Sequence, residues 1–307
     1  MRDAVGLFQQ AEQRVFARYG VAPEPRLVEL SEPPLRVRVL EWGEGLPLLL
    51  VPDDGAIAAT WAPLLAELRG RRTIVLDRPG FGLGAGFDYR GADLRRHGGA
   101  VLRSLLDALG LDAVPIVGSS GGGQWSLWLA LDEPTRVRAL APMGIPAVCL
   151  SGFRPNASMR LVSMPGLGRA MVSLPSPSPK VTGKMLARAD ARLLDHPELV
   201  DVYHAAMRLP GYGRTTAAIF RRSLRIGGAA RRTLVLADDE LTRIAQPVLF
   251  IWGDHEPFGG PHVAHRAAEL MPDARVEVVA HAWHHPWLAD APGVARLLLD
   301  FLAEHGT

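Results

Sequence analysis

The sequence predicts an α/β fold: a doubly wound, mostly parallel sheet into which a helical lid is inserted. From residue 35 onward, short apolar runs alternate with amphipathic stretches, which is typical of parallel strands covered by helices on both faces. One of these runs passes through a glycine-rich turn directly into a helical stretch. The alternation stops near Gly144 and resumes at Pro247, which indicates an insertion between two strands.

The first part of the chain divides into short elements, each with its own pattern. Residues 5–18 have apolar side chains at helical spacing and predict a surface helix, and residues 35–40 alternate like an edge strand. Four apolar runs predict buried strands, at residues 47–51, 73–77, 115–117 and 137–141. Helices are expected at residues 61–68, 93–109 and 124–131. Pro115 fits this scheme only as the first residue of its strand, because proline has no N–H to donate to a neighbouring strand.

The second part begins with a long stretch that does not follow this rhythm. Residues 145–242 contain helical stretches with several methionines, no convincing strand before residues 233–236, and a Pro-Ser alternation at residues 174–179. We interpret this stretch as a helical lid over the top of the sheet. Strands at 247–252 and 275–279 and helices at 262–270 and 294–305 then complete the core. The predicted division is a core of residues 1–144 and 243–307 with a lid of residues 145–242.

Composition narrows the class of protein. Hydrophobic residues make up 48% and charged residues 21%, as in ordinary soluble globular proteins. The formal charge is +2 and the paired arginines are scattered among acidic and apolar neighbours, so no nucleic-acid partner is predicted. Cys149 is the only cysteine, which rules out an intrachain disulfide and a cysteine-based metal site. Because the chain has no signal-peptide pattern and no run of about 18 apolar residues, we expect no membrane association and a cytoplasmic location.

The turn at residues 118–122 carries the strongest chemical signal. Its sequence, Gly-Ser-Ser-Gly-Gly, has the spacing G-x-S-x-G with Ser120 at the apex. A sharp strand-to-helix turn strains the apex backbone, and small neighbours let the turn close while the hydroxyl projects above the sheet. The backbone N–H of Gly121 would then point at the position where an oxyanion forms. An ordinary Gly/Ser turn is the alternative for these five residues taken alone.

Acidic and histidine residues follow the two later strands. A serine nucleophile needs a base that takes its proton and a carboxylate that orients this base. In an open parallel sheet, such groups lie at the carboxyl ends of the strands. The candidates that follow these two strands are Asp254, Glu256, His281, His284 and His285.

Together these features resemble the α/β-hydrolase fold superfamily, in its lidded branch with a serine nucleophile. The resemblance covers about residues 35–151 and 244–301 and leaves the lid uncovered. The motifs that carry it are the elbow at 118–122, the Asp-Arg-Pro-Gly-Phe-Gly turn at 77–82, Trp252-Gly253, and the His-x-Pro-Trp-Leu ending at 284–288.

The resemblance implies a catalytic triad. Ser120 matches the family's nucleophile. The family's acid usually lies three residues after the glycine of Trp-Gly, which favours Glu256 over Asp254. His284 matches both the preceding strand and the following Pro-Trp-Leu, although the spacing later in the chain would favour His285. A serine at the elbow argues against the haloalkane dehalogenase and epoxide hydrolase members, which have aspartate there.

The turn after the strand at 47–51 departs from the family pattern. The family usually has His-Gly there, whereas this chain has Pro52 followed by Asp53 and Asp54. The N–H of Asp53 would be the second oxyanion donor beside that of Gly121. Two carboxylates next to a developing anion oppose its formation unless they point away or are protonated. The side chains further expected to contact the substrate are Asp54, Ser119 and Trp125.

The predicted function is cofactor-independent hydrolysis of a carboxylic ester or related acyl bond in a small, apolar molecule. His284 would deprotonate Ser120, and Glu256 would stabilise the imidazolium. The lid residues that suggest an apolar acyl or alcohol group are Met159, Leu161, Met164, Met171, Met185 and Met207. Two alternatives remain: a non-hydrolytic lyase or cyclase of secondary metabolism, and a non-catalytic ligand-binding protein on the same scaffold.

Two other kinds of site are disfavoured. Residues 80–85 have the outline Gly-x-Gly-x-x-Ala of a dinucleotide fingerprint, but the loop continues where a helix should begin. No metal is predicted, because the histidine-rich end lacks a paired carboxylate spacing. The oligomeric state stays open.

Overall fold

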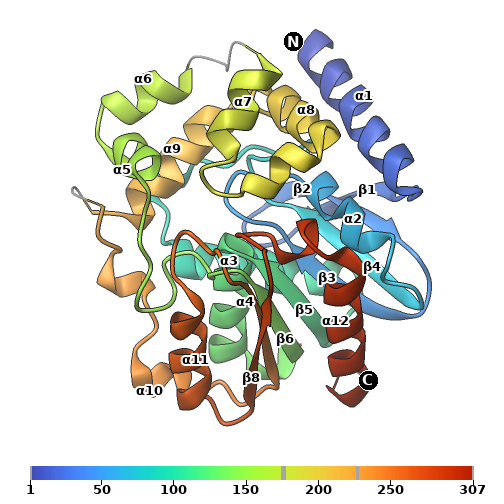
Figure 1. Ribbon diagram of the computed structural model, residues 1–307, viewed down its shortest axis with the longest axis vertical. Helices are drawn as coiled ribbons and strands as arrows, with labels where there is room; N and C mark the ends of the chain where they lie inside the picture. Colours follow the sequence, from blue (N-terminus) through green and yellow to red (C-terminus); the bar gives the residue numbers. More distant parts are fainter. Residues whose placement is uncertain (1, 174–177, 226–227, 306–307) are drawn as a thin grey trace.

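A computed structural model of the chain describes residues 2–173, 178–225 and 228–305, which fold around one eight-stranded sheet (Figure 1). The strand order is β1-β2-β4-β3-β5-β6-β7-β8. The strands are β1 (Glu24–Leu30), β2 (Leu35–Trp42), β3 (Leu46–Val51), β4 (Arg71–Asp77), β5 (Val114–Ser119), β6 (Val137–Met143), β7 (Val248–Gly253) and β8 (Ala274–Val279). The β1–β2 and β2–β4 pairs are antiparallel, and all the others are parallel. The mostly parallel α/β architecture expected from the sequence is confirmed.

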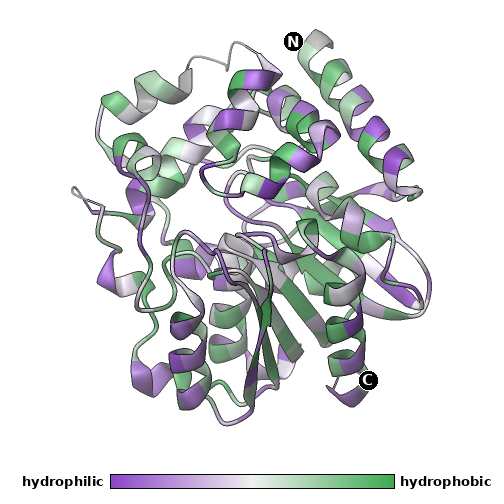
Figure 2. Ribbon diagram, viewed as in Figure 1, coloured by the Kyte–Doolittle hydropathy of each residue, from purple (hydrophilic) through white to green (hydrophobic). Residues whose placement is uncertain are grey.

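Helices cover both faces of the sheet. Those of the core are α1 (Arg2–Tyr19), α2 (Ala62–Leu65), α3 (Leu94–Ala108), α4 (Gly121–Asp132), α11 (Pro261–Leu270) and α12 (Ala291–His305). Helices α3, α4 and α11 lie on one side of the sheet, and α2 and α12 lie on the other (Figure 1). The central strands are accordingly apolar along their whole length (Figure 2), and residues 48–51 and 249–252 are fully buried. Burial on both faces explains why these strands read as continuous apolar runs rather than as alternating ones.

The edge of the sheet differs from the prediction. Residues 35–40 belong to β2, which lies between β1 and β4, so this strand is not the edge strand that we expected. The edge strand on this side of the sheet is β1, which the sequence pattern does not indicate. In β1 only Val28 and Leu30 are buried, and the strand includes Pro25, so its apolar pattern is weak. Proline is tolerated there because an edge strand needs hydrogen bonds on one side only.

Two further local expectations are corrected. Pro115 is the second residue of β5 and not the first, and the pairing with β6 shifts register between Val114 and Ile116. This irregularity accommodates a residue without an N–H. Residues 233–236 form no strand: Arg232–Leu234 is a 3₁₀ turn, and the N–H of Leu236 donates to the carbonyl of Cys149.

Helices fill the connection between β6 and β7. They are α5 (Ala157–Ser163), α6 (Leu167–Ser173), α7 (Pro179–Leu186), α8 (Pro197–Ala206), α9 (Tyr212–Ser223) and α10 (Asp238–Leu241). Helices α5 to α9 lie above the end of the sheet (Figure 1). Part of the Pro-Ser alternation, residues 174–177, lies outside the described residues, whereas Ser178 caps the N-terminus of α7. The treatment of residues 145–242 as a separate lid stays a prediction.

The N-terminal helix α1 joins the core to these inserted helices. It packs beside α8 (Figure 1), and the hydroxyl of Tyr19 donates to Glu198 at 2.5 Å. On the core side, Glu12 pairs with Arg38 of β2, which also binds Asp77. Within the described residues, no helix has the length and apolar character needed to cross a membrane.

Candidate active site

Ser120 stands at a strained turn between β5 and α4. Its backbone has φ 45° and ψ −113°, values that few non-glycine residues adopt. The chain can turn this sharply because Gly118 and Gly123 approach each other: a Cβ on Gly118 would lie 2.5 Å from the backbone nitrogen of Gly123. Gly122 likewise packs against the carbonyl of Val51 at the end of β3. The glycines of the motif therefore seat Ser120 at the carboxyl end of the central strands.

Glu256 and His284 form a buried pair at the ends of β7 and β8. The Nδ1 atom of His284 lies 2.7 Å from Oε2 of Glu256, and the two side chains are 4% and 0% exposed. The carboxylate also accepts hydrogen bonds from the backbone N–H groups of Ile145 and Phe258, both at 3.1 Å. Gly144, at φ +65°, leaves room for this pair, since a Cβ there would lie 2.9 Å from Oε2 of Glu256. Among the described residues, no hydrogen-bond partner faces Nε2 of His284, so this nitrogen is available to a reacting group.

Ser120 and His284 open on the same cavity, which has a volume of about 360 Å³. Asp53 and Asp54 also line it, and most of the remaining wall is apolar. Four of the six apolar residues expected to face the substrate do so: Met159, Met171, Met185 and Met207. Leu161 and Met164 do not line the cavity. The serine, the histidine and an apolar wall thus meet in one space.

Asp254, the alternative acid, lies elsewhere. Its Oδ1 accepts the backbone N–H of Ala282 at 3.1 Å and lies 2.6 Å from Nδ1 of His255. Its side chain is 35% exposed. This is a turn residue that bonds local groups. Of the two acids considered, Glu256 is the one that contacts His284.

His285 is bound quite differently from its neighbour. Its Nε2 lies 3.1 Å from Asp53 and its Nδ1 lies 3.0 Å from Asp190, an aspartate of the inserted segment. The backbone N–H of His285 also donates to Asp190 at 2.7 Å. Burial alone would lower the pKa of His285, but the hydrogen bonds to Asp190 and Asp53 outweigh it and raise this pKa to about 10. Burial favours a higher pKa for Asp53, yet the hydrogen bond and charge of His285 hold it below its usual value.

Asp54 has a cation of its own. Nη1 of Arg78 lies 2.8 Å from Asp54, and the guanidinium stacks 3.9 Å from the ring centre of Trp125. Burial raises the pKa of Asp54, while the charge of Arg78 opposes this rise. A Cβ on Gly121 would lie 2.6 Å from Oδ2 of Asp54, so glycine is needed where the elbow meets this pair. Both acids of the unusual turn therefore face a positive partner.

Two of the expected substrate contacts are not in the cavity wall. Trp125 is buried beneath Arg78, and Ser119 is 1% exposed with its hydroxyl directed to no hydrogen-bond partner among the described residues. Ser119 ends β5 just before the apex, whereas Trp125 lies on α4 and packs against Gly98 of α3. Asp54 does line the cavity, as expected.

A sequence profile whose description is alpha/beta hydrolase fold matches residues 51–290. The chain belongs to this family. It is 30% identical to 2-hydroxy-6-oxo-2,4-heptadienoate hydrolase of Pseudomonas putida, over 85% of this chain and 90% of that protein. Its fold is similar to that of carboxylesterase CesB from Bacillus subtilis, with a TM-score of 0.79, 20% identity and coverage of 98% and 99%. It is also similar to a meta-cleavage product hydrolase from Pseudomonas fluorescens IP01, with a TM-score of 0.74, 21% identity and coverage of 91% and 97%. These relatives are hydrolases, which supports hydrolase activity for this α/β hydrolase and leaves the bond open.

Three residues of this α/β hydrolase come close enough together to be considered for a metal. Ligand atoms of Asp53, His284 and His285 lie within 4.8 Å of one another. A metal requires a lone pair on the histidine nitrogen. Both ring nitrogens of His285 face carboxylates, so this histidine offers no free lone pair, and the set fits hydrogen bonding better than metal binding.

The glycine-rich loop after β4 does not open a helix, as a dinucleotide fingerprint would. The N–H of Gly80 donates to the carbonyl of Ala85, which closes the loop on itself. The next helical turn in the chain begins only at Tyr89. A fingerprint that opens no helix lacks the N–H groups that hold a pyrophosphate.

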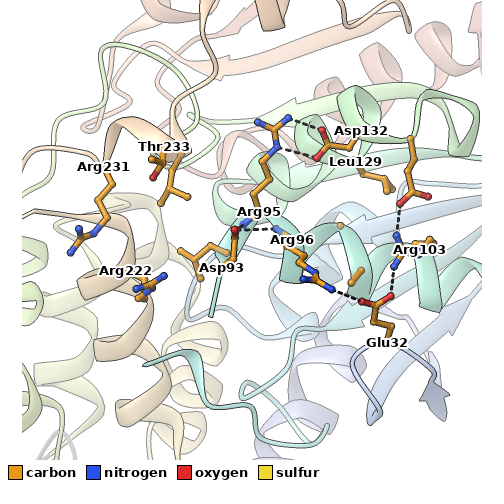
Figure 3. A pocket seen from close by; sticks show the side chains of 15 residues that line it. Glu32, Asp93, Arg95, Arg96, Arg103, Leu129, Asp132, Arg222, Arg231 and Thr233 are labelled. Carbon is orange, nitrogen blue, oxygen red and sulfur yellow. Dashed lines mark hydrogen bonds and ion pairs between the residues drawn. The ribbon is translucent and has the colours of Figure 1, made fainter. Parts of the chain in front are cut away.

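A second cavity, of about 740 Å³, shares no residue with the first (Figure 3). Its charges are mostly paired across the wall: Arg95 binds Asp132, and Arg103 binds Glu32 and Glu133. This hollow is a network of surface salt bridges and contains no nucleophile beside a base.

Sequence reasoning missed Asp190 and the role of Arg78. Asp190 lies in the segment that no motif covers, and a single aspartate there gives no signal of its own. In the sequence, Arg78 stands out only as part of the turn at 77–82. Its proximity to Asp54 depends on β3 and β4 being neighbours, which the sequence alone does not specify.

Proposed function

We propose that this protein is a serine hydrolase that cleaves a carboxylic ester or a related acyl bond of a small, uncharged and largely apolar molecule. One observation carries the proposal: the strained Ser120 and the buried His284–Glu256 pair open on one apolar cavity. This arrangement supplies a nucleophile, a base and an acid that orients the base.

The reaction follows from these positions. Nε2 of His284 takes the proton of Ser120 as the hydroxyl oxygen attacks the carbonyl carbon, and Glu256 stabilises the resulting imidazolium. The backbone N–H groups of Gly121 and Asp53 hold the oxyanion. Collapse of the tetrahedral intermediate expels the alcohol, which takes the proton from His284 and leaves an acyl group on Ser120. Water, deprotonated by His284, then releases the acid.

The preference for an uncharged substrate rests on the cavity wall. Among the described residues that line it there is no lysine or arginine. Its one strongly cationic group, His285, already lies between two carboxylates. A substrate carboxylate would therefore lose its hydration without finding a free cation, which is unfavourable in a buried site.

A second candidate activity is hydrolysis of a 2-hydroxy-6-oxodienoate at a C–C bond. It is favoured by the 30% identity to a hydrolase named for such a compound. The same nucleophile and base would serve both reactions. The missing cation for the dienoate carboxylate is the observation that ranks this candidate second.

Two measurements test the proposal. A fluorophosphonate probe should label wild-type protein and Ser119→Ala at Ser120, and Ser120→Ala should not be labelled. Steady-state assays should then give higher kcat/KM for p-nitrophenyl esters of short to medium chains than for a 2-hydroxy-6-oxodienoate. Labelling that persists in Ser120→Ala would contradict the nucleophile. A preference of tenfold or more for the dienoate would make C–C hydrolysis the better account.

The cytoplasmic location, the small-molecule substrate and the lid boundaries at 145 and 242 stay part of this proposal. A first proteolytic cut between residues 35 and 140 would mean that the division into core and lid is misplaced.

A further inference from the structure

His285 is surrounded by acceptors on both sides of its ring. Carboxylate oxygens lie 3.1 Å from Nε2 and 3.0 Å from Nδ1. A neutral imidazole carries a proton on only one nitrogen and could donate to only one of them, whereas an imidazolium donates to both. Its side chain is 4% exposed, and those of Asp53 and Asp190 are 14% and 0% exposed, so both bonds are largely shielded from water. With both carboxyl groups ionised, this geometry favours a doubly protonated ring.

The three partners come from three distant segments. Asp53 lies in the turn after β3, and the backbone N–H of Asp53 is the proposed second oxyanion donor. Asp190 precedes the 3₁₀ helix Ala191–Asp195 of the inserted segment and also caps it, through Oδ1 and the N–H of Arg192 at 2.9 Å. His285 follows β8 beside the proposed base. One cation thus fixes the oxyanion turn against both the core and the inserted helices.

The contact between His285 and Asp53 would affect catalysis because of the charge on Asp53. Its carboxylate is attached to the residue whose N–H would hold the oxyanion, and a ligand atom of it lies within 4.8 Å of His284. An unpaired anion at that distance would oppose the negative charge that develops in the transition state. A fixed cation 3.1 Å away cancels most of this effect.

We infer that His285 is a positioning residue: a permanent imidazolium that neutralises Asp53, holds its backbone in the oxyanion turn and ties that turn to Asp190 of the inserted helices. The inference rests on the proposed Ser120 chemistry. The other ionisable groups that act on this cluster are His284, whose ring centre is 5.1 Å away, the paired Asp54 and Arg78, and two buried tyrosines. The tyrosines are Tyr203 of α8 and Tyr212 of α9, and burial raises the pKa of both above the usual value. Both tyrosines are therefore neutral and do not compensate Asp53.

The decisive experiment compares His285→Gln with the double variant Asp53→Asn/His285→Gln. The glutamine amide can still donate from the position of Nε2 but carries no charge. We expect His285→Gln to lower the single-turnover acylation rate with a p-nitrophenyl ester by about 100-fold, the size of an oxyanion-hole defect, with KM changed less than threefold. The double variant, which also lacks the Asp53 carboxylate, should acylate at least ten times faster than His285→Gln. A double variant no faster than His285→Gln would overturn the inference.

Two matched variants separate charge from architecture. His265→Gln removes an exposed histidine of α11 and should leave the rate unchanged. Asp190→Asn keeps the Asp53–His285 pair and should lower the rate less than tenfold. If Asp190→Asn and His285→Gln lower the acylation rate equally, the effect comes from packing and not from the charge of His285, and the inference fails. Activity that falls on treatment with a chelator and returns with Zn²⁺ would also overturn the inference, because a metal needs a deprotonated ring.

A measurement on the unaltered protein covers the case in which His285→Gln does not fold. In protein with ¹⁵N-labelled histidine, one ring should keep the imidazolium pattern of two protonated nitrogens up to pH 8.5, and this signal should shift in Asp190→Asn. Absence of any such ring would refute the inference whatever the kinetics. If Ser120 is not labelled by the fluorophosphonate, the proposed function fails, and the spectrum still decides the charge of His285.

Discussion

His284 and His285 are adjacent in the chain, equally buried and 5.1 Å apart between ring centres, yet their surroundings give them opposite properties. Among the residues that the structure describes, His284 bonds one carboxylate, that of Glu256, and its Nε2 has no hydrogen-bond partner. His285 contacts Asp53 and Asp190, one with each ring nitrogen. A histidine with one acidic partner is oriented and can still exchange a proton. A histidine between two acids is held as a cation and cannot act as a base near neutral pH.

The origins of the partners differ in the same way. Glu256 follows β7, the strand that pairs with β8 just before His284, so the sheet itself brings the two together. Asp190 comes from the inserted helices, far from the sheet in sequence. Both side chains of the proposed reactive pair therefore come from the core, and Ile145 at the start of the inserted segment adds one backbone hydrogen bond to Glu256. The proposed cation at His285 depends on a side chain of the inserted segment, that of Asp190.

The largest effect is expected for His284→Ala. Loss of the proposed base should lower kcat by about 10⁴-fold or more, because the imidazole that would take the proton of Ser120 is removed. The same ester assay with His265→Gln, which alters an exposed histidine, serves as the control. If His284→Ala keeps a tenth of the wild-type activity, His284 is not the base, and the roles proposed for the two histidines are wrong.

Glu256→Gln should follow, with kcat about 10³-fold lower. The amide can still occupy the space but cannot stabilise an imidazolium, and it can favour the wrong tautomer of His284. Asp254→Asn, two residues earlier in the same turn, is the matched control and should change kcat less than threefold. A larger loss in Asp254→Asn would show that the turn, and not the Glu256 carboxylate, limits the reaction.

The same contrast explains which features of the site could be predicted from the sequence. Glu256 and His284 lie in contact, as a triad would require, because both follow strands of a repetitive sheet in which position along the chain determines position in space. The elbow was predictable for the same reason, because its glycines are needed for close backbone contacts. The catalytic roles of Ser120, Glu256 and His284 stay predictions.

What could not be predicted depends on packing between distant segments. From the sequence, the carboxylates of Asp53 and Asp54 are expected to oppose an oxyanion beside them. Nothing in the sequence indicates that His285 and Arg78 lie close enough to neutralise them. Strand β1 was missed because an edge strand buries few of its side chains. In the inserted segment, helical periodicity indicates helices but does not say which aspartate will point at the core.

Asp190→Asn tests the seating of the inserted helices through stability. It leaves an uncharged partner at a buried imidazolium, so we expect the free energy of unfolding to fall by about 2 to 3 kcal/mol. Asp195→Asn, in the same 3₁₀ helix but 61% exposed, should change it by less than about 0.5 kcal/mol. Urea denaturation at pH 7 provides both values. Equal, small changes would mean that Asp190 and His285 do not form a charged pair in solution.

The smallest effect concerns pH, and its sign is fixed by the raised pKa of His285. In the folded protein the hydrogen bonds to Asp190 and Asp53 outweigh burial and bring this pKa to about 10, against roughly 6.5 in the unfolded chain. The folded state therefore holds a proton that the unfolded state has lost above roughly pH 6.5. The stabilisation is complete below that pH and disappears as pH rises toward about 10.

One such proton contributes a slope of about 1 kcal/mol per pH unit between pH 7 and pH 9. Other groups also titrate in this range, so the quantity to measure is the difference between variants. Urea denaturation of the wild-type protein and of His285→Gln, at half-unit steps of pH, should give a steeper decline for the wild type. Parallel declines would mean that His285 is neutral in the folded protein, and the contrast between the two histidines would then have to be explained by packing alone.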